Sequence, residues 1–206
     1  MSSQIATKPS AAAREPKRQR GRLRVAAILE TGRDVFIERG YDAATMTEIA
    51  ARSGTAIGSL YRFFPSKESL ADALMQQFGQ RMTDGLSTLA ELSSDMTPEA
   101  LATALVDLML GLKEERSFII ALMDARGGNA ELKARYRDVT LQGALNVVRQ
   151  VVPHLPRAKS EAMAIVLLHV LKIVPRTAEE QYEPATQRAV LAEIRELIRL
   201  YLVSAP

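Results

Sequence analysis

The 206-residue sequence predicts an all-α protein of about nine helices. Alanine and leucine are abundant, whereas aromatic residues make up only 5% of the chain. No segment shows the sustained alternation of apolar and polar residues that marks β-strands. Glycine, proline, serine and threonine occur at the spacings where helices begin and end. Apolar residues account for 47% of the sequence, which is enough for a sizeable core and argues against general disorder.

The N-terminal arm is basic and is predicted to be disordered up to about residue 16, because it has no apolar periodicity. Residues 1–24 hold seven bases and one acid, whereas residues 25–206 hold 20 bases and 23 acids. The excess positive charge therefore lies in this arm, which suits contact with phosphate or with a DNA minor groove. A solvated tail that only aids solubility is an equal alternative. The bases are Lys8, Arg14, Lys17, Arg18, Arg20, Arg22 and Arg24.

Three helices are expected between residues 23 and 64. The first spans about 23–39, and Gly40 follows it at a position that favours a left-handed cap. The second begins at Thr45, because Thr45 and Glu48 have the spacing of a capping box, and it stops at Gly54. The third, about 56–63, is short because Pro65 ends it.

The rest of the chain predicts longer helices with recognisable boundaries. Ser66 caps the first of them, and Thr97 with Pro98 forms a cap and first turn. A very apolar helix over 157–173 is expected to be kinked or ended by Pro175. The predicted ranges are 66–92, 97–113, 117–126, 129–152, 157–173 and 184–203.

Two short helices joined by a tight glycine turn are the arrangement of a helix-turn-helix that reads DNA. The 3.6-residue period directs Leu60 and Phe64 inward, against Ile49 and Ala50. The same period turns the opposite side of the third helix outward, at least in part. The outward positions are Ile57, Gly58, Tyr61 and Arg62.

The segment from Thr45 to Gly54, followed by Thr55 to Ser59 and the run LYRFFPSKESL that ends at Leu70, resembles the TetR family of bacterial repressors. The likeness covers residues 24–70, about a quarter of the chain. It implies that Thr45 and Thr47 lie against a phosphate at a helix N-terminus. It further implies that Ile57, Gly58 and Ser59 enter the major groove and that Tyr61 and Lys67 hold the DNA backbone. The complete predicted DNA-binding set is Arg20, Arg22, Thr45, Thr47, Thr55, Ile57, Gly58, Ser59, Tyr61, Arg62 and Lys67.

Two residues depart from the family pattern, which often has a polar residue at Ile57 and histidine at Phe63. Ile57 cannot hydrogen-bond a base edge, so contact with a thymine methyl group is expected. Phe63 cannot donate to a phosphate, so that anchor is either missing or supplied by Arg62. Simpler roles stay open: Tyr61 as a partly buried core aromatic, Ile57 packed on the first helix, and Arg62 and Lys67 as solvated charges.

The last helix and the apolar helix before it predict a two-fold dimer. Apolar side chains follow one another along the last helix at positions 190, 191, 194, 197, 198 and 201. Together the two helices offer more apolar surface than one slim helical layer buries, although ordinary core packing is the alternative. The resemblance implies the same pair of helices. The predicted interface residues are Val166, Val170, Leu191, Ile194, Ile198 and Tyr201.

The resemblance also implies that a small, largely apolar molecule binds among the middle helices and releases DNA. For each candidate residue the alternative is plain core packing, including a satisfied core histidine at His169. Arg126 has the further alternative of an ion pair with Asp124 or a nearby acid. The candidate lining residues are Phe78, Met82, Met109, Phe118, Leu122, Met123, Arg126, Tyr136 and His169.

No enzymatic site is expected. The chain has no cysteine, two widely separated histidines (His154 and His169) and no glycine-rich phosphate loop. Neither HExxH nor GxSxG occurs, so no catalytic residue, metal or cofactor is predicted. No apolar run reaches the ~20 residues that cross a bilayer, and no signal peptide is recognised, so a cytoplasmic protein is expected.

The sequence therefore predicts a homodimeric repressor that binds double-stranded DNA at a palindromic operator and responds to a small-molecule effector. The predicted domains are a basic arm (1–20), a helix-turn-helix domain (21–66) and a helical effector-binding and dimerisation domain (67–206). A helical adaptor or ligand-binding protein that does not bind DNA is the alternative. Activation in place of repression also stays open.

Overall fold

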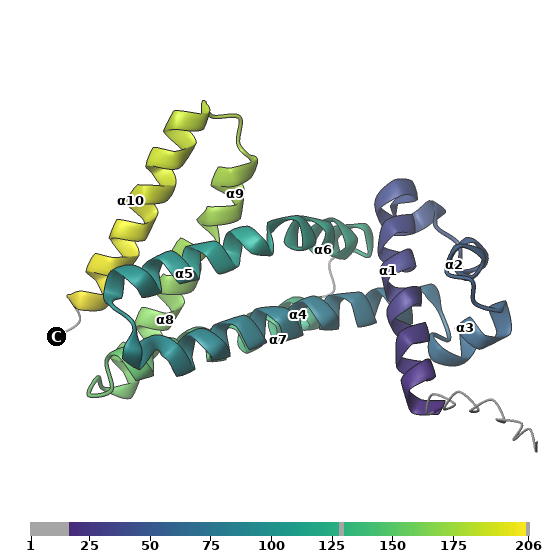
Figure 1. Cartoon of the computed structure of the whole chain (residues 1–206), viewed down its shortest axis with the longest axis horizontal. Coiled ribbons are helices and arrows are strands. Elements are labelled where there is room, and N and C mark those ends of the chain that lie inside the picture. The colour runs from purple at the N-terminus through teal and green to yellow at the C-terminus, as the bar shows by residue number, and fades with distance from the viewer. Residues whose placement is uncertain (1–16, 128–129, 205–206) are drawn as a thin grey trace, which may run out of the picture.

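The computed structural model describes residues 17–127 and 130–204, and within these ranges every regular element is a helix. The all-α prediction is confirmed. Figure 1 shows an elongated molecule with three helices at one end and a longer layer of helices extending away from them. None of the described helices is both long and apolar enough to span a membrane.

The end unit consists of α1 (Lys17–Ala43), α2 (Met46–Arg52) and α3 (Ile57–Phe63). Gly40 interrupts α1 with a φ of 76°, the positive φ that the sequence predicts there, but its ψ of 161° is extended, so it does not form the predicted left-handed cap. Gly54 has a φ of 62° in the turn between α2 and α3. Arginine and lysine are good helix formers, which explains why α1 begins before its first apolar positions.

The longest element of the helical layer, α4 (Lys67–Leu92), joins the end unit to the rest of the molecule. Ser66 caps it as predicted, because its hydroxyl accepts a hydrogen bond from the Ser69 backbone N–H at 3.2 Å. Ser69 reciprocates by accepting from the Ser66 N–H at 3.1 Å. One face of α4 is buried along its whole length, through Leu70, Ala71, Leu74, Met75, Phe78, Met82, Leu86 and Ala90.

The remaining helices pack around α4. A 3₁₀ turn (Ser93–Asp95) leads into α5, and α4 then packs along α7, α7 along α8, and α5 along α10. α8 and α10 lie at the end of the molecule remote from α1–α3 (Figure 1). The bounds are α5 Pro98–Gly111, α6 Lys113–Ala125, α7 Ala130–Val151, α8 Arg157–Leu171, α9 Ile173–Glu179 and α10 Pro184–Val203.

The nine predicted helices are all present, with ends that shift by a few residues, and α9 is an addition. The apolar helix α8 ends at Leu171, four residues before Pro175, which has no N–H to donate to the Leu171 carbonyl, and this is the end that the sequence predicts. Pro175 lies in the first turn of α9, where a helix has no hydrogen bond for the missing proline N–H to lose. Thr97 caps α5 as predicted, by accepting from the Ala100 N–H at 3.2 Å.

Gly143 marks the closest approach of α7 to α4 and provides a test of the packing. A Cβ added at Gly143 would lie 2.9 Å from the Leu86 Cβ, whereas one added at Gly21 in α1 meets nothing within 4 Å. Alanine is favoured over glycine in helices by about 1 kcal/mol, but overpacking a core costs about 1–3 kcal/mol. We therefore expect Gly143→Ala to lower the free energy of unfolding in urea. The matched control Gly21→Ala should leave it unchanged or raise it, and equal effects of the two changes would contradict this packing.

Candidate nucleic-acid interface

The helix α3, predicted to be the recognition helix, rests on a buried apolar layer. Leu60 and Ile49 are fully buried, and Phe64 and Ala50 are nearly so, as the helical period predicts. α2 and α3 pack on each other and α2 packs on α1, so the three helices hold one another in place. The packing of the buried side of α3 against α2 therefore determines which way its exposed side faces.

The outer face of α3 presents the four residues that the period directs outward. Ile57 is 42% exposed and Tyr61 is 46% exposed, and Gly58 and Arg62 are exposed as well. These values favour surface roles for Tyr61 and Ile57 over core packing. Ser59 differs from its predicted role, because its hydroxyl oxygen is buried and has no hydrogen-bond partner among the described residues.

Basic side chains flank α3 on the neighbouring part of α1. Arg20 and Arg22 are exposed in the first turns of that helix. Arg22 and Phe63 line the same shallow depression, so the start of α1 lies beside the end of α3. The Arg62 guanidinium carbon lies 5.6 Å from the centre of the Phe63 ring. Phe63 therefore lies between the start of α1 and the end of α3, with Arg22 beside it on α1 and Arg62 against its ring.

At the N-terminus of α2, the hydroxyl half of the predicted capping box is present. The Thr45 hydroxyl accepts from the Glu48 N–H at 3.2 Å, and Thr47 is exposed beside it. The Glu48 carboxylate, however, pairs with Arg39 at 3.4 Å and with Arg52 at 3.7 Å, which draws it away from the cap. Thr55, in the turn before α3, is buried and donates a long hydrogen bond of 3.5 Å to the Ser53 carbonyl.

An ion pair ties α2 to α1. Both guanidinium nitrogens of Arg52 donate to the Glu38 carboxylate, at 2.6 Å and 2.8 Å. These hydrogen bonds hold the pKa of Glu38 below its ordinary value. Arg52 is therefore engaged within the three-helix unit, although it lies on α2.

Lys67 has a structural role that the sequence did not predict. Its ammonium group donates to the carbonyl oxygens of Tyr41, Asp42 and Ala44 at 2.7, 3.0 and 3.2 Å. It also lies 4.6 Å from the centre of the Tyr41 ring. The three donors of an ammonium group are thus all used on the turn that joins α1 to α2, and we leave Lys67 out of the proposed DNA surface.

Residues 28–74 match the bacterial regulatory proteins of the tetR family. A TetR-family transcriptional regulator from Mesorhizobium loti has the same fold over 90% of this chain and 96% of its own, with a TM-score of 0.68 and 18% identity. The N-terminal three-helix unit of the chain therefore has a TetR-family sequence, and the chain as a whole has a TetR-family fold.

Curated relatives match this chain mainly in its N-terminal part. An HTH-type transcriptional repressor of Mycobacterium tuberculosis is 34% identical over 87 residues, which cover 40% of this chain and 46% of the relative. The HTH-type transcriptional activator FasR of Mycolicibacterium smegmatis is 36% identical over 37% of this chain and 33% of its own length. The chain thus matches less than half the length of these relatives.

The predicted effector residues fall into two groups. Phe78, Met82, Met109 and Leu122 are buried in the core, and Met123 is half-buried against it. Phe118 lies at the surface between α1, α4 and α6, where it lines a cleft. The side chain of Tyr136 lies outside the described residues. His169 is exposed on α8, with its Nδ1 2.7 Å from the Ile165 carbonyl oxygen, so it faces neither the core nor a pocket there.

Arg126, at the end of α6, contacts both α4 and the end unit. Its guanidinium lies 2.6 Å from the Asp72 carboxylate on α4 and its central carbon 5.8 Å from the Tyr41 ring centre. The Tyr41 hydroxyl in turn donates to Glu68 at 3.2 Å. Burial, with the Glu68 charge, raises the pKa of Tyr41. Arg126 therefore pairs with a nearby acid, Asp72, as one of its predicted alternatives states.

The predicted dimer residues are divided between the inside and the outside of the protomer. Ile198 is only 1% exposed and Ile194 is buried, so neither can present surface to a second chain. The apolar stripe of α10 is wider than one face, because positions 194 and 198 pack on the core while Leu197 and Leu200 point outward. Val166 is exposed on α8. Val170, Leu191 and Tyr201 are half-buried against the core.

Over residues 17–127 and 130–204, no group of three or more acidic or histidine side chains has an arrangement that could hold a metal ion.

The role of Lys67 provides a test. We expect Lys67→Ala to lower the free energy of unfolding by about 1–3 kcal/mol, because three backbone carbonyls lose a charged donor. The measurement is urea unfolding followed by circular dichroism. Lys159→Ala, at an exposed position at the start of α8, is the matched control and should change stability little. A neutral effect of Lys67→Ala would contradict the structural role.

Proposed function

We propose that this chain is a DNA-binding transcriptional repressor of the TetR family that acts as a homodimer on a palindromic operator and is released by a small-molecule effector. The observation that carries the proposal is the outer face of α3, which turns Ile57, Gly58, Tyr61 and Arg62 away from a rigid apolar layer. The names of the relatives include both a repressor and an activator, and repression is the direction that we propose. A regulator of this kind acts at the bacterial chromosome, and hence in the cytoplasm.

The reading surface favours apolar contact and close approach over hydrogen bonding to bases. Ile57 suits a thymine methyl group, and Gly58 lets the backbone come close to the groove. Arg62, Arg20 and Arg22 supply positive charge on either side of it, which suits phosphates. We infer that phosphate contacts carry most of the affinity, so that binding weakens steeply as salt rises.

The outer faces of α8 and α10 support the dimer. On the side opposite its core-facing residues, α8 exposes Ile165 and Val166. The small residue Ala162 is exposed one turn earlier on the same side. A helix that is apolar on both sides needs a second partner. α10, which contacts α8, adds Leu197 and Leu200. A two-fold axis through these faces brings two copies of α3 to one side of a duplex, as a palindromic operator requires.

The effector acts, in this proposal, by favouring one arrangement of the helices around α4. α4 begins beside the turn that Lys67 holds and continues through the buried core. An effector shifts DNA affinity only by its own difference in affinity for the two arrangements.

The DNA proposal is tested by selecting bound duplexes from a random pool. We expect a palindromic consensus whose half-sites are about 10 base pairs apart, or a multiple of that spacing. Selection without enrichment would overturn the proposed function. On the selected duplex, Arg62→Ala should lower the slope of log affinity against log salt by about 1, because one phosphate contact is lost.

The control for this measurement is Arg188→Ala, which removes an exposed arginine from α10 at the other end of the molecule. It should leave both the affinity and the salt slope unchanged. An unchanged slope for Arg62→Ala as well would remove Arg62 from the phosphate contacts.

The dimer is tested with Leu197→Glu, which places a charge at a side chain that is 52% exposed on the outer face of α10. We expect light scattering to show the mass of a dimer for the unchanged chain and of a monomer for the variant, because a buried unpaired carboxylate is costly. Ile37→Glu, at an exposed isoleucine on α1, is the matched control and should stay dimeric. A dimeric Leu197→Glu variant would move the interface elsewhere.

A further inference from the structure

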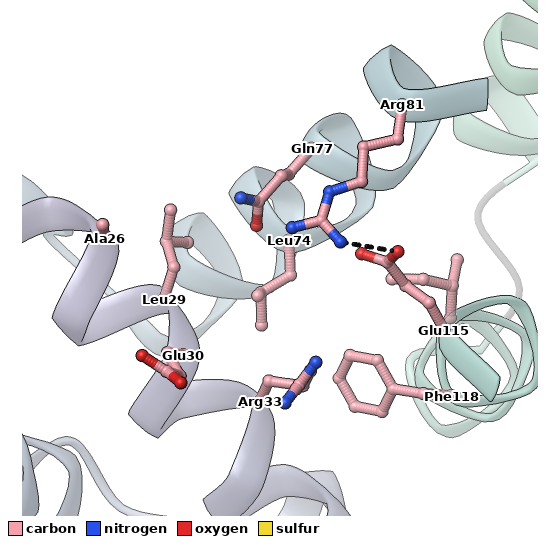
Figure 2. A pocket seen from close by; sticks show the side chains of 10 residues that line it. Ala26, Leu29, Glu30, Arg33, Leu74, Gln77, Arg81, Glu115 and Phe118 are labelled. Atoms are coloured by element: carbon pink, nitrogen blue, oxygen red, sulfur yellow. Dashed lines mark hydrogen bonds and ion pairs between the residues drawn. The ribbon is translucent and has the colours of Figure 1, made fainter. Parts of the chain in front are cut away.

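A cleft opens where α1 meets α4 and α6, outside the buried core. Its volume is about 230 Å³, smaller than the pockets of about 300–1,000 Å³ that take drug-sized ligands. Figure 2 shows side chains from all three helices converging on it. The lining residues used below are Leu29, Arg33, Leu74, Arg81, Glu115 and Phe118.

Two arginines line the cleft. Arg81 forms an ion pair across it, whereas Arg33 keeps hydrogen-bond donors available for a ligand. Arg81 reaches from α4 to α6, where its NH1 lies 3.0 Å from the Glu115 carboxylate. Arg33 points toward Phe118 in Figure 2 and pairs with its own neighbour Asp34 at 3.3 Å, with both side chains 43% exposed. Exposed pairs of this kind are weak. The planar fork of Arg33 is therefore suited to a ligand carboxylate.

The charges that line the cleft balance, with Arg33 and Arg81 against Glu30 and Glu115, so the case for an anion rests on the donors of Arg33 that its weak pair with Asp34 does not use. Glu115 is held by Arg81, so its charge is largely offset there. Glu30 also lines the cleft, but Figure 2 shows its carboxylate on the α1 side, turned away from Phe118. The group at the centre of the cleft that lacks a strong partner is thus positively charged.

An apolar row leads from Arg33 along α1 toward the recognition helix. The cleft shares Ala26, Leu29 and Gln77 with an open depression of about 440 Å³, which extends to Val25 and Phe63. Positions 33, 29, 26 and 22 follow the helical spacing on one face of α1, with the apolar Leu29 and Ala26 between arginines at both ends. At 1.5 Å per residue, positions 33 and 22 are about 16 Å apart along the helix. A flexible chain bound at Arg33 therefore has an apolar path that ends at α3.

We propose that this groove binds a carboxylic acid with an unbranched aliphatic tail, with the carboxylate on Arg33 and the tail along Leu29 and Ala26 toward Phe63. Such a ligand touches α1, α4 and α6 together and reaches Phe63, whose ring lies against Arg62. As the effector site of the proposed repressor, the groove rests on that proposed function. The binding itself does not depend on it.

The test is calorimetric titration of the whole chain, without DNA, with octanoate as the probe. We expect the affinity to rise about fourfold for each methylene between butanoate and octanoate, because each buried methylene contributes about 0.8 kcal/mol. 1-Octanol and octylamine should bind at least tenfold more weakly, because neither offers an anion to Arg33.

Two variants separate the head of the ligand from its tail. Arg33→Gln should weaken octanoate at least tenfold, whereas Arg188→Gln on α10 should not change it. Ala26→Trp, at an exposed position on the shared wall, should weaken octanoate while leaving butanoate unchanged. In a parallel measurement, octanoate should alter operator affinity in the unchanged chain but not in Arg33→Gln.

Several results would overturn the proposal. These are absence of octanoate binding, equal binding of octanol, equal effects of Arg33→Gln and Arg188→Gln, or loss of binding only when a bulky residue replaces core residue Met109. Failure of the proposed function shows itself differently: octanoate binds as described, but no duplex is selected. If octanoate binds and a duplex is selected, an unchanged operator affinity would separate the groove from regulation.

Discussion

The crossing of α1 over α4 at Gly32 fixes how the end unit sits on the rest of the molecule. A Cβ at Gly32 would lie 2.9 Å from the Leu70 Cδ2, so the two helices approach closely there. Leu70 is fully buried at this point, and on α1 the fully buried Ile28 and Val35 flank Gly32. Because α1 also carries α2 and α3, the direction in which α3 faces is set by this crossing.

The two sides of the crossing are held differently. On one side Lys67 fills the turn after α1 with three hydrogen bonds, and Arg126 lies over the Tyr41 ring. On the other side the cleft leaves Arg33 facing α6 with little between them (Figure 2). α1 nevertheless packs on α6 as well as on α4, so the cleft is a local gap beside contacts between these helices.

α6 is held against α4 both by its own buried residues and by ion pairs. Ile119 and Leu122 on α6 are buried in the core. Two ion pairs also join the helices, Arg81 with Glu115 near the start of α6 and Asp72 with Arg126 at its end. Arg81 and Asp72 are more than half exposed, and pairs with an exposed partner contribute little to stability. The buried residues therefore anchor α6, and the ion pairs at the edge of the cleft add little to that anchoring.

Local chemistry made much of this fold predictable. The caps at Thr45, Ser66 and Thr97 and the glycines with positive φ need only neighbouring residues, and the inward side of α3 follows from the helical period. Contacts between residues far apart in the chain were not predictable. Arg126 pairs with Asp72, which lies 54 residues earlier in the chain. Lys67 donates to carbonyl groups more than 20 residues earlier. Backbone carbonyls carry no sequence signal, so a lysine that binds them resembles one that binds phosphate.

The apolar stripe of α10 shows a second limit, since a period reveals a face but not what covers it. Ile194 and Ile198 fill the protomer core, and their neighbours Leu197 and Leu200 remain outside. The same limit explains why predicted effector residues such as Phe78 and Met82 lie in the core. The sequence pattern of apolar residues is the same in a core and in a pocket. The cleft was missed for the opposite reason. Much of its lining is charged or lies on α1, which the period assigns to the end unit.

The composition of α3 links the reading of DNA to the placement of α1. With Ile57 and Gly58 outward, the helix offers few side chains that hydrogen-bond bases, and the nearby charge comes from Arg62 and the start of α1. Contacts with phosphates depend on the distance between two charged segments, because the phosphates are fixed by the duplex. Phe63 lies between those segments, at the end of the groove that begins at Arg33. A regulator that relies on phosphates is therefore sensitive to small displacements of α1, and in this chain the groove runs along the helix whose position matters most.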